Sequence, residues 1–287
     1  MTPETIAILA SISFALFAVY GWLGLRCSTP LTATIVSLAA RTVTLGAAVV
    51  FSGGIPVYKP AAMAVFVFLG ILQSAISLLT FIGLQKIGTS RSQPLRNSYP
   101  LWSAMIAIVV MHEQVSMAVL AGTLLVVAGV VLISWKPQAV TPTYRIWNVL
   151  YSLGAGFLAG LAFPLRRYGL TITNEPVFFS FVIAIVSLFG AVPYIRWTSS
   201  GQGLVWNRKG VMYFFISGFC EALGALLTLV ALTTARVVIV SPIVATTPLF
   251  SLVISLVFLR GKEQVTTLTI FGTVAVVAGT VAIVLGK

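Results

Sequence analysis

The sequence contains no aspartate, a single histidine and only five acidic residues among 287 positions. Charged residues make up 8% of the chain, whereas a soluble domain devotes about a quarter of its residues to charge. No polar stretch is long enough to fold alone. These shortages exclude a soluble globular domain. A hydrophobic content of 59% and a mean hydropathy of +1.08 indicate a polytopic membrane protein.

Cysteine and histidine are too few for a metal site or a disulfide framework. Cys27, Cys220 and His112 lie far apart and show no ligand spacing. We therefore expect no metal and no cofactor. The sequence also lacks a paired Asp/His set and a nucleophile motif, which argues against a membrane-embedded enzyme. Because no nucleotide-binding motif is present, any transport would draw on a solute or proton gradient.

The net charge of +12 does not indicate nucleic-acid binding, because the 17 basic residues stand mostly singly between apolar runs. A nucleic-acid surface would gather them on one polar face. Scattered basic residues at the ends of apolar runs are typical of interfacial anchors. The expected partners are a small-molecule solute and membrane lipids, with no nucleic acid, and we expect a monomer.

Ten apolar runs are long enough to cross the bilayer, since about 20 helical residues span about 30 Å of hydrocarbon. The first run has no basic segment before it and is interpreted as a retained span, not a signal peptide. The sequence therefore predicts an all-α polytopic protein. The runs are 5–25, 30–51, 60–84, 88–111, 116–135, 147–168, 175–195, 209–231, 236–259 and 266–285.

The two halves of the chain are copies of each other. Residues 113–133 align without a gap with residues 263–283, with 11 identities in 21 positions. Upstream, glycines, a Leu-Leu-Thr triplet and two prolines recur at an offset of 148 residues. The organisation predicted is a first five-helix repeat at 1–136, a linker at 137–146 and a second repeat at 147–287. Because five is odd, the second repeat must be inverted, as in many secondary transporters.

Several residues beside the duplication carry a family resemblance. They are Arg41 in the second span, the Pro-Leu-Trp-Ser and Pro-Leu-Phe-Ser segments at 100–103 and 248–251, Glu113 and Glu263 after those spans, and the pair Arg166-Arg167. On these features the whole sequence resembles the drug/metabolite transporter superfamily, specifically its ten-span EamA-type members. The resemblance implies that spans one, three, four, six, eight and nine surround a central cavity. It also implies export of amino acids or other small metabolites.

The fourth span opens with polar residues that are candidates for solute binding. If its helix begins near Gly88, Arg96 lies two turns inside and shares one face with Ser92, Tyr99 and Ser103. A charge placed in hydrocarbon normally faces a cavity or a partner. Arg96, together with Asn97, Tyr99 and Trp102, would suit a carboxylate-bearing or aromatic solute. The alternative is that Arg96 only packs against helix carbonyls or a neighbouring acid.

The ninth span keeps the prolines of the fourth but not its charge. Val244 stands where Arg96 would be, and Ser241 and Thr246 supply the polar atoms. Each proline removes a backbone hydrogen bond. They are interpreted as structural kinks, or alternatively as gating hinges. The four positions are Pro94, Pro100, Pro242 and Pro248.

A second set of polar residues lies in the middle of the third and eighth spans. Gln73 and Ser77 follow helical spacing in one, and Glu221 and Thr228 in the other. A lone buried glutamate is a candidate proton carrier. Alternatively, Glu221 forms an ion pair with Arg41 or Arg96, and we favour the pair.

Two further groups of charges have structural and functional interpretations. Arg41 either contacts the solute or anchors its helix. Glu113 and Glu263 each precede an N-cap residue, Ser116 or Thr266, and are expected to stabilise the start of the span that follows.

Orientation is predicted in two conflicting ways. The family resemblance implies that both termini are cytoplasmic. Five basic residues, including Arg166 and Arg167, are assigned to the side of the termini and ten to the opposite side, which favours termini outside. We keep the family orientation.

The sequence thus predicts a secondary transporter for a small organic metabolite in a bacterial or archaeal cytoplasmic membrane, acting by alternating access. The alternatives are a flippase for lipids or polyprenyl phosphates and an exchanger of nucleotide sugars or organic phosphates, since arginines also hold phosphate.

Overall fold

The computed structural model describes residues 2–87, 95–134, 146–198, 204–258 and 267–286, and within these ranges the chain is helical and contains no strand. The helices are α1 (Pro3–Leu25), α2 (Pro30–Phe51), α3 (Pro60–Ile87), α5 (Tyr99–Met111), α6 (Met117–Ser134), α7 (Val149–Ile172), α8 (Pro176–Thr198), α9 (Arg208–Thr234), α10 (Val237–Val244), α11 (Thr247–Phe258) and α12 (Thr267–Leu285), with a short 3₁₀ turn at Ile146–Asn148.

The helices match the ten predicted spans. Seven are long and apolar enough to cross a membrane, and three further apolar helices are shorter. The fourth span comprises α5 and the helical residues before it, and the ninth comprises α10 and α11. The chain is therefore an all-α, multi-pass membrane protein built from two five-span repeats, as predicted.

The starts of several helices follow from local sequence. Thr2 and Thr29 each accept a hydrogen bond from the backbone N–H three residues later, and proline follows each of them. The Asn207 side chain accepts from the backbone N–H groups of Lys209 and Gly210 and so begins α9. These caps fix where three spans enter the bundle.

The fourth and ninth spans are interrupted at equivalent positions. A turn at 97–98 separates the helical residues 95–96 from α5, and a turn at 245–246 separates α10 from α11. The turns correspond at the offset of 148 that relates the repeats. In each, the hydroxyl of Ser98 or Thr246 donates to the carbonyl three residues earlier at 2.7 Å. The two repeats therefore share not only the turn but also the side-chain hydrogen bond that closes it.

Proline explains where these interruptions fall. Pro100 and Pro248 lie in the first turn of α5 and α11, where a missing N–H costs no intrahelical bond. The fourth span is not one continuous helix through Arg96, Tyr99 and Ser103, because the turn at 97–98 interrupts it; Ser92 lies outside the described residues, and a shared face stays a prediction. In the ninth span, where Pro242 and Pro248 were expected to kink the helix, the turn at 245–246 ends one helix and begins the next.

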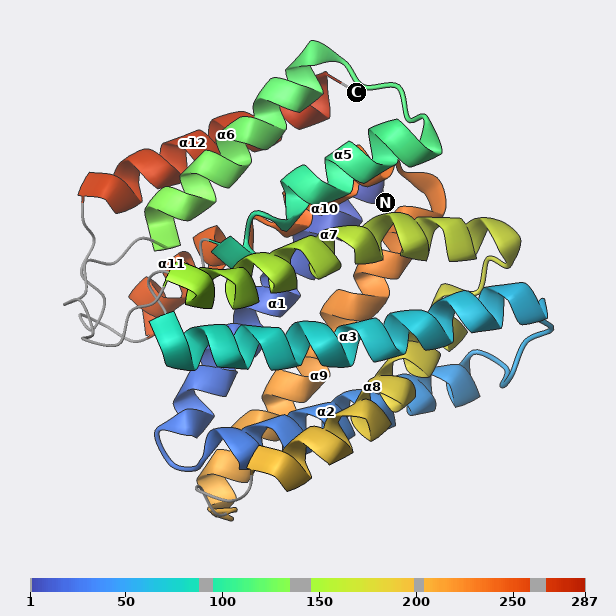
Figure 1. Cartoon of the computed structure of the whole chain (residues 1–287), viewed down its shortest axis with the longest axis vertical. Helices are drawn as coiled ribbons and strands as arrows, with labels where there is room; N and C mark the ends of the chain where they lie inside the picture. Colours follow the sequence, from blue (N-terminus) through green and yellow to red (C-terminus); the bar gives the residue numbers. More distant parts are fainter. Residues whose placement is uncertain (1, 88–94, 135–145, 199–203, 259–266, 287) are drawn as a thin grey trace.

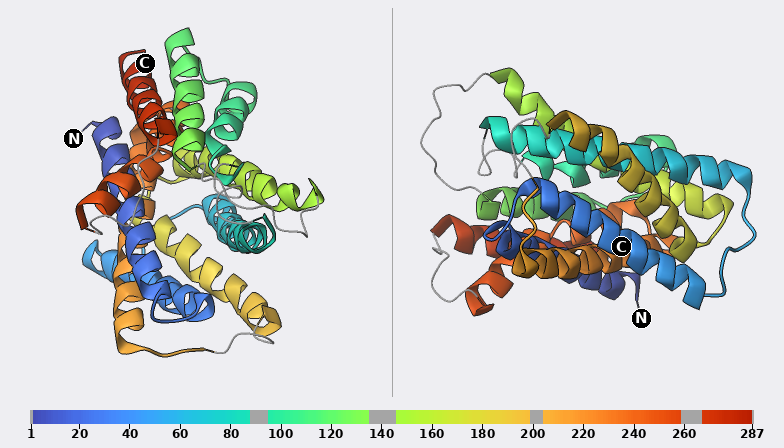
Figure 2. Two further views of the ribbon diagram at one scale, coloured as in Figure 1. Left: turned by 90° about the vertical axis from the view of Figure 1, so that its left-hand side faces the viewer. Right: turned by 90° about the horizontal axis from the view of Figure 1, so that it is seen from below.

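Close helix packing mostly joins one repeat to the other. α1 packs against α9 as α3 packs against α7, and α2 packs against α9 as α8 packs against α3. The pairs α2–α8 and α6–α12 map onto themselves when the repeats are exchanged. Figure 1 shows α3 beside α7 and α6 beside α12, and Figure 2 places the α6–α12 pair at one edge of the bundle. The repeats therefore share a core and are not separate folding units.

The α6–α12 pair is held together by glycines. A Cβ atom added at Gly129 would lie 2.6 Å from the carbonyl oxygen of Gly272, and one at Gly272 would lie 2.7 Å from that of Gly129. Gly122 and Gly279 repeat this arrangement two turns away. Small residues at helical spacing thus let the two helices approach closely.

Candidate functional site

An ion pair lies in the middle of two spans. Arg41 is the twelfth of 22 residues in α2, and Glu221 is the fourteenth of 27 in α9. The Nη1 atom of Arg41 lies 2.9 Å from Oε1 of Glu221, and the arginine side chain is only 3% exposed. Of the two states expected for Glu221, the structure shows the ion pair with Arg41. Its role as a proton carrier stays a prediction.

Two more arginines lie within electrostatic reach of this pair. Arg96, beside the turn at 97–98, interacts with Glu221 and with Tyr99. Arg166 of α7 interacts with Arg41 and also with Tyr99. Three guanidinium groups and one carboxylate are therefore brought together from four spans, two in each repeat. We call Arg41, Arg96, Arg166 and Glu221 the central cluster.

Four buried N–H donors in and beside the central cluster have no hydrogen-bond partner among the described residues. They are the Nε atoms of Arg41, Arg96 and Arg166 and the Nε1 atom of Trp102. Buried polar groups are normally paired, so unpaired donors on all three arginines of the central cluster and on Trp102 of the adjoining α5 are unusual. Because all four are donors beside excess positive charge, they suit an anionic group, which accepts hydrogen bonds and donates none.

Aromatic rings line α5 and α7 next to these donors. Tyr99 stacks on Phe163 with ring centroids 5.4 Å apart, and Trp102 meets Phe157 edge to face at 5.4 Å. The Arg166 guanidinium lies 5.5 Å from the Phe163 ring centroid, a cation–π distance. The arrangement combines cationic donors with a rigid apolar wall.

Glycines in α7 bring that helix against the interrupted fourth span. A Cβ atom at Gly156 would lie 2.9 Å from the carbonyl oxygen of Leu95 and 3.0 Å from that of Arg96. At Gly160 it would lie 2.8 Å from the carbonyl oxygen of Tyr99. This glycine pair therefore holds the residues around the turn at 97–98 close against α7.

Hydroxyl groups link the fourth and ninth spans. The Ser103 and Ser241 hydroxyls share a hydrogen bond, and both side chains are fully buried. Thr246 bonds the Ser11 hydroxyl at 3.0 Å besides closing its own turn. Ser241 and Thr246 were predicted to contact solute, and both hydroxyls have partners within the protein.

The other predicted polar residues are distributed around the core. The hydroxyls of Thr228 and Ser77 donate to carbonyl oxygens four residues earlier in their own helices. Gln73 is half-buried on α3, and Asn97 is buried in the turn before α5. Their contact with solute stays a prediction.

Three of the predicted kink prolines are described. Pro100 and Pro248 begin the helices that follow the turns, and Pro242 lies inside α10. Pro94 lies outside the described residues. A gating role for these prolines stays a prediction.

Glu113 has a different partner from the one expected. Its two carboxylate oxygens accept hydrogen bonds from the backbone N–H groups of Val237 and Val238, at 3.0 and 3.2 Å. It therefore caps α10 of the other repeat, while Ser116 caps α6 as predicted by accepting from Val119. The prediction that Glu113 stabilises its own following span is wrong, because helix packing brings a different helix N-terminus nearer. Glu263 lies outside the described residues.

Arg166 is the site residue that the sequence interpretation missed. The sixth span was expected to end near it, but α7 continues to Ile172, so Arg166 lies about 9 Å inside the helix end. Arg167, its neighbour, donates to the carbonyls of Leu232 and Thr233 at the end of α9. The assignment of Arg166 to interfacial charge is therefore wrong. The apolar residues that follow Arg167 were the available signal.

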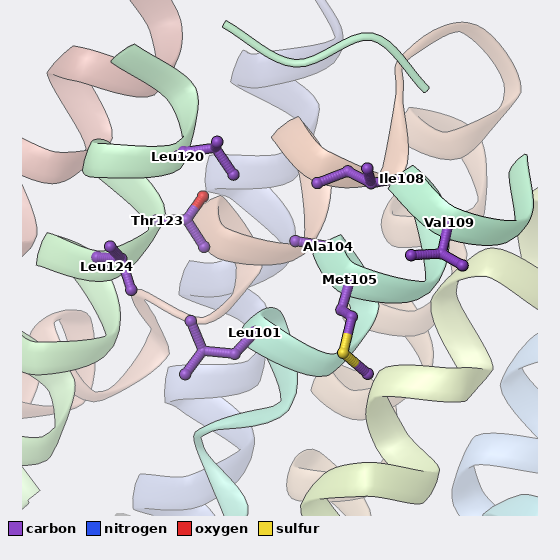
Figure 3. Close-up of a pocket in the computed structure, with 8 residues that line it drawn as sticks. All are labelled: Leu101, Ala104, Met105, Ile108, Val109, Leu120, Thr123 and Leu124. Atoms are coloured by element: carbon purple, nitrogen blue, oxygen red, sulfur yellow. The ribbon is translucent and has the colours of Figure 1, made fainter. Parts of the chain in front are cut away.

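A groove of about 360 Å³ lies between α5 and α6, away from the central cluster. Figure 3 shows its walls, which carry a single polar side chain, Thr123. Met105, Val109 and Leu124 line it and are also exposed on the outer surface of the bundle. The groove therefore faces lipid and does not suit a charged solute.

Comparison with known sequences and structures decides the family. A sequence profile of the EamA-like transporter family matches residues 1–135 and 146–285. The chain belongs to this family. A solved structure titled only "Crystal structure of protein" superposes with a TM-score of 0.82 at 15% identity, covering 99% of this chain and 96% of its own, and so shares the fold. No curated protein matches in a direct sequence comparison.

This EamA-like transporter is therefore a membrane transporter of the drug/metabolite type, as the resemblance implied. A transporter of this type acts on a small-molecule solute and is surrounded by membrane lipid. In this EamA-like chain the central cluster joins elements of both matched halves: Arg41 and Arg96 come from the first and Arg166 and Glu221 from the second.

Proposed function

We propose that this EamA-like chain is a secondary transporter that exports a small organic metabolite across the cytoplasmic membrane of a bacterium or archaeon, with both termini inside. One observation carries the proposal. Charged, partly unpaired side chains converge at mid-span, where a broken helix of one repeat meets helices of the other. Secondary transporters built from inverted repeats bind solute at such a place.

The equivalent turns at 97–98 and 245–246 act as hinges for the conformational change of transport. Each turn ends one helical segment and begins the next within a single span. The two segments can therefore tilt relative to each other about the turn. The hydrogen bond between Ser103 and Ser241 connects the two broken spans. Inverted repeats that rock against each other would open the solute site to one side and then to the other.

Counterflow exchange tests this function. Purified protein in proteoliposomes would be loaded with unlabelled amino acids, sugars, dicarboxylates or nucleotides and assayed for uptake of the same labelled solute. We expect one class to exchange, and we expect Arg96→Ala to reduce its exchange about 10–100-fold, because a charge-assisted hydrogen bond is lost. Arg26→Ala is the control, since Arg26 is exposed and stacks on Trp22. Equal exchange by the Arg96 and Arg26 variants would remove Arg96 from the site.

A lipid flippase is the second candidate, and the groove between α5 and α6 favours it. The groove is apolar, opens toward lipid and lies on the same helix as Tyr99 and Trp102. An acyl chain in the groove could accompany a phosphate headgroup at the arginines. If no soluble solute exchanges and a fluorescent lipid reporter is translocated, the flippase replaces the exporter.

A further inference from the structure

The charge of the central cluster is not balanced among the described residues. Arg41, Arg96 and Arg166 bring three positive charges and Glu221 brings one negative charge, so the cluster holds two positive charges in excess. The other described acidic residues stand at helix ends. Uncompensated charge within membrane-spanning helices is costly, and it usually marks a pathway for a charged substrate.

The excess charge is carried by Arg96 and Arg166. Glu221 is hydrogen-bonded to Arg41, and this pair is neutral. Arg96 and Arg166 both interact electrostatically with Tyr99, whose ring stacks on Phe163, and the Arg166 guanidinium lies 5.5 Å from that same Phe163 ring. As whole side chains they are half-buried, but their Nε atoms are fully buried and lack partners. Two guanidinium groups thus present donors with no acceptor assigned to them within the described chain.

We propose that the transported solute is a small organic dianion, bound by Arg96 and Arg166. Its two negative charges reside on two carboxylates or on one phosphate monoester, and both chemistries provide only hydrogen-bond acceptors. Guanidinium groups recognise carboxylates and phosphates in bidentate fashion. This inference rests on the proposed transport function and narrows its substrate class.

Zwitterionic amino acids fit the central cluster less well than dianions. An amino acid has no net charge and would leave the two-charge excess in place. Its ammonium group would also lie near three guanidinium groups, while Glu221 already accepts from Arg41. Like charges at such short range oppose binding. The aromatic wall of Tyr99 and Trp102 can cover the carbon skeleton of the solute instead.

Thermal unfolding of the full-length protein in detergent tests the substrate class. The transition temperature would be measured against rising concentrations of succinate, glycerol 3-phosphate, 1-acyl-glycerol 3-phosphate, alanine and putrescine. A ligand that binds only the native state raises this temperature progressively once its concentration exceeds its dissociation constant. We expect succinate or glycerol 3-phosphate to stabilise the protein, and alanine and putrescine to have no effect.

Arg166→Gln tests the assigned residue, and Arg167→Gln is its matched control. The first variant is expected to bind the stabilising dianion about 10–100-fold more weakly, because one charge-assisted contact is lost. The second removes the same charge one position away, where Arg167 bonds the end of α9, and should keep the affinity. Since the buried Nε atom of Arg166 has no partner among the described residues, the ligand-free Arg166→Gln protein should unfold at no lower temperature than the parent.

Each result separates this inference from the proposed function. The inference is overturned if no dianion stabilises the protein, if alanine or putrescine binds equally well, or if Arg166→Gln keeps full affinity. Exchange of a zwitterion without dianion binding would overturn the inference while leaving the transport function in place. Dianion binding without counterflow would support the dianion site at Arg96 and Arg166 and overturn the transport function. Stabilisation by the acylated phosphate alone would support the dianion site and assign its ligand to a lipid.

Discussion

Glutamine in place of Glu221 is expected to lower the free energy of unfolding by about 3–5 kcal/mol. The substitution keeps the shape of the side chain but leaves the Arg41 guanidinium, only 3% exposed, without its carboxylate. It also removes the carboxylate that interacts electrostatically with Arg96. Removing one partner of a buried ion pair costs more than the pair contributes, because the remaining charge stays buried. Denaturant unfolding of the purified protein in detergent would measure the loss.

A double variant checks that the loss comes from the ion pair. Arg41→Leu combined with Glu221→Leu removes both charges and should recover part of the stability lost in Glu221→Gln. Full recovery is not expected, since Arg96 and Arg166 still lack the carboxylate. Unchanged stability of the Glu221→Gln protein would show that Arg41 does not depend on this partner.

Alanine in place of Gly129 is expected to destabilise the contact between α6 and α12. The new Cβ atom would lie 2.6 Å from the Gly272 carbonyl oxygen and 2.8 Å from the backbone nitrogen of Val276. Neither backbone atom can move without shifting its helix, so the cost should reach the upper end of about 1–3 kcal/mol. Adding Gly272→Ala places a second methyl group at the same crossing. The double variant should unfold at a still lower temperature.

Gly154→Ala is the matched control for this substitution. Gly154 lies inside α7, and an added Cβ atom would meet only the Leu79 side chain at 3.6 Å, an ordinary contact. Alanine is favoured over glycine in a helix by about 1 kcal/mol, so stability should be equal or higher. If Gly129→Ala were as stable as Gly154→Ala, the two helices would have to be farther apart than in this structure.

The architecture was predictable because its causes are local. Apolar length defines the spans, and the matched residues at offsets of 150 and 148 define the repeats. The odd number of spans then requires inversion. The glycine contacts of α6 with α12 are consistent with the same logic, since small residues at helical intervals favour close helix packing.

The turns that interrupt the fourth and ninth spans were predictable only in part. Proline made a kink at Pro100 and Pro248 foreseeable, and residues 95–96 are helical, as expected for a span that begins before Pro100. Proline does not specify whether a helix bends or ends. Here the hydroxyls of Ser98 and Thr246 close the turns by bonding nearby carbonyls, which favours ending the helix.

The contacts that charged side chains make with other helices were the least predictable part of the structure. Glu113 precedes α6 in the sequence but caps α10. Arg166 was expected at the end of the sixth span but interacts with Arg41 and Tyr99 in the core. Both outcomes depend on which helix packs nearby and on where α7 ends. A single sequence carries no direct record of either. Composition did place Arg41 and Glu221 at mid-span, where a buried charge needs a partner.

The central claim is that the turn in the interrupted fourth span becomes accessible to solution from each side of the membrane in turn. Chemical labelling of a single cysteine at position 97 tests this claim. Cys27 and Cys220 would be replaced by alanine and Asn97 by cysteine in the full-length protein. A membrane-impermeant maleimide would then be applied to right-side-out and to inside-out vesicles. Asn97 is 9% exposed and lies in the turn before α5. We predict reaction in both kinds of vesicle, since each repeat opens the turn to one side. Reaction in only one kind, or in neither, would contradict alternating access at this site.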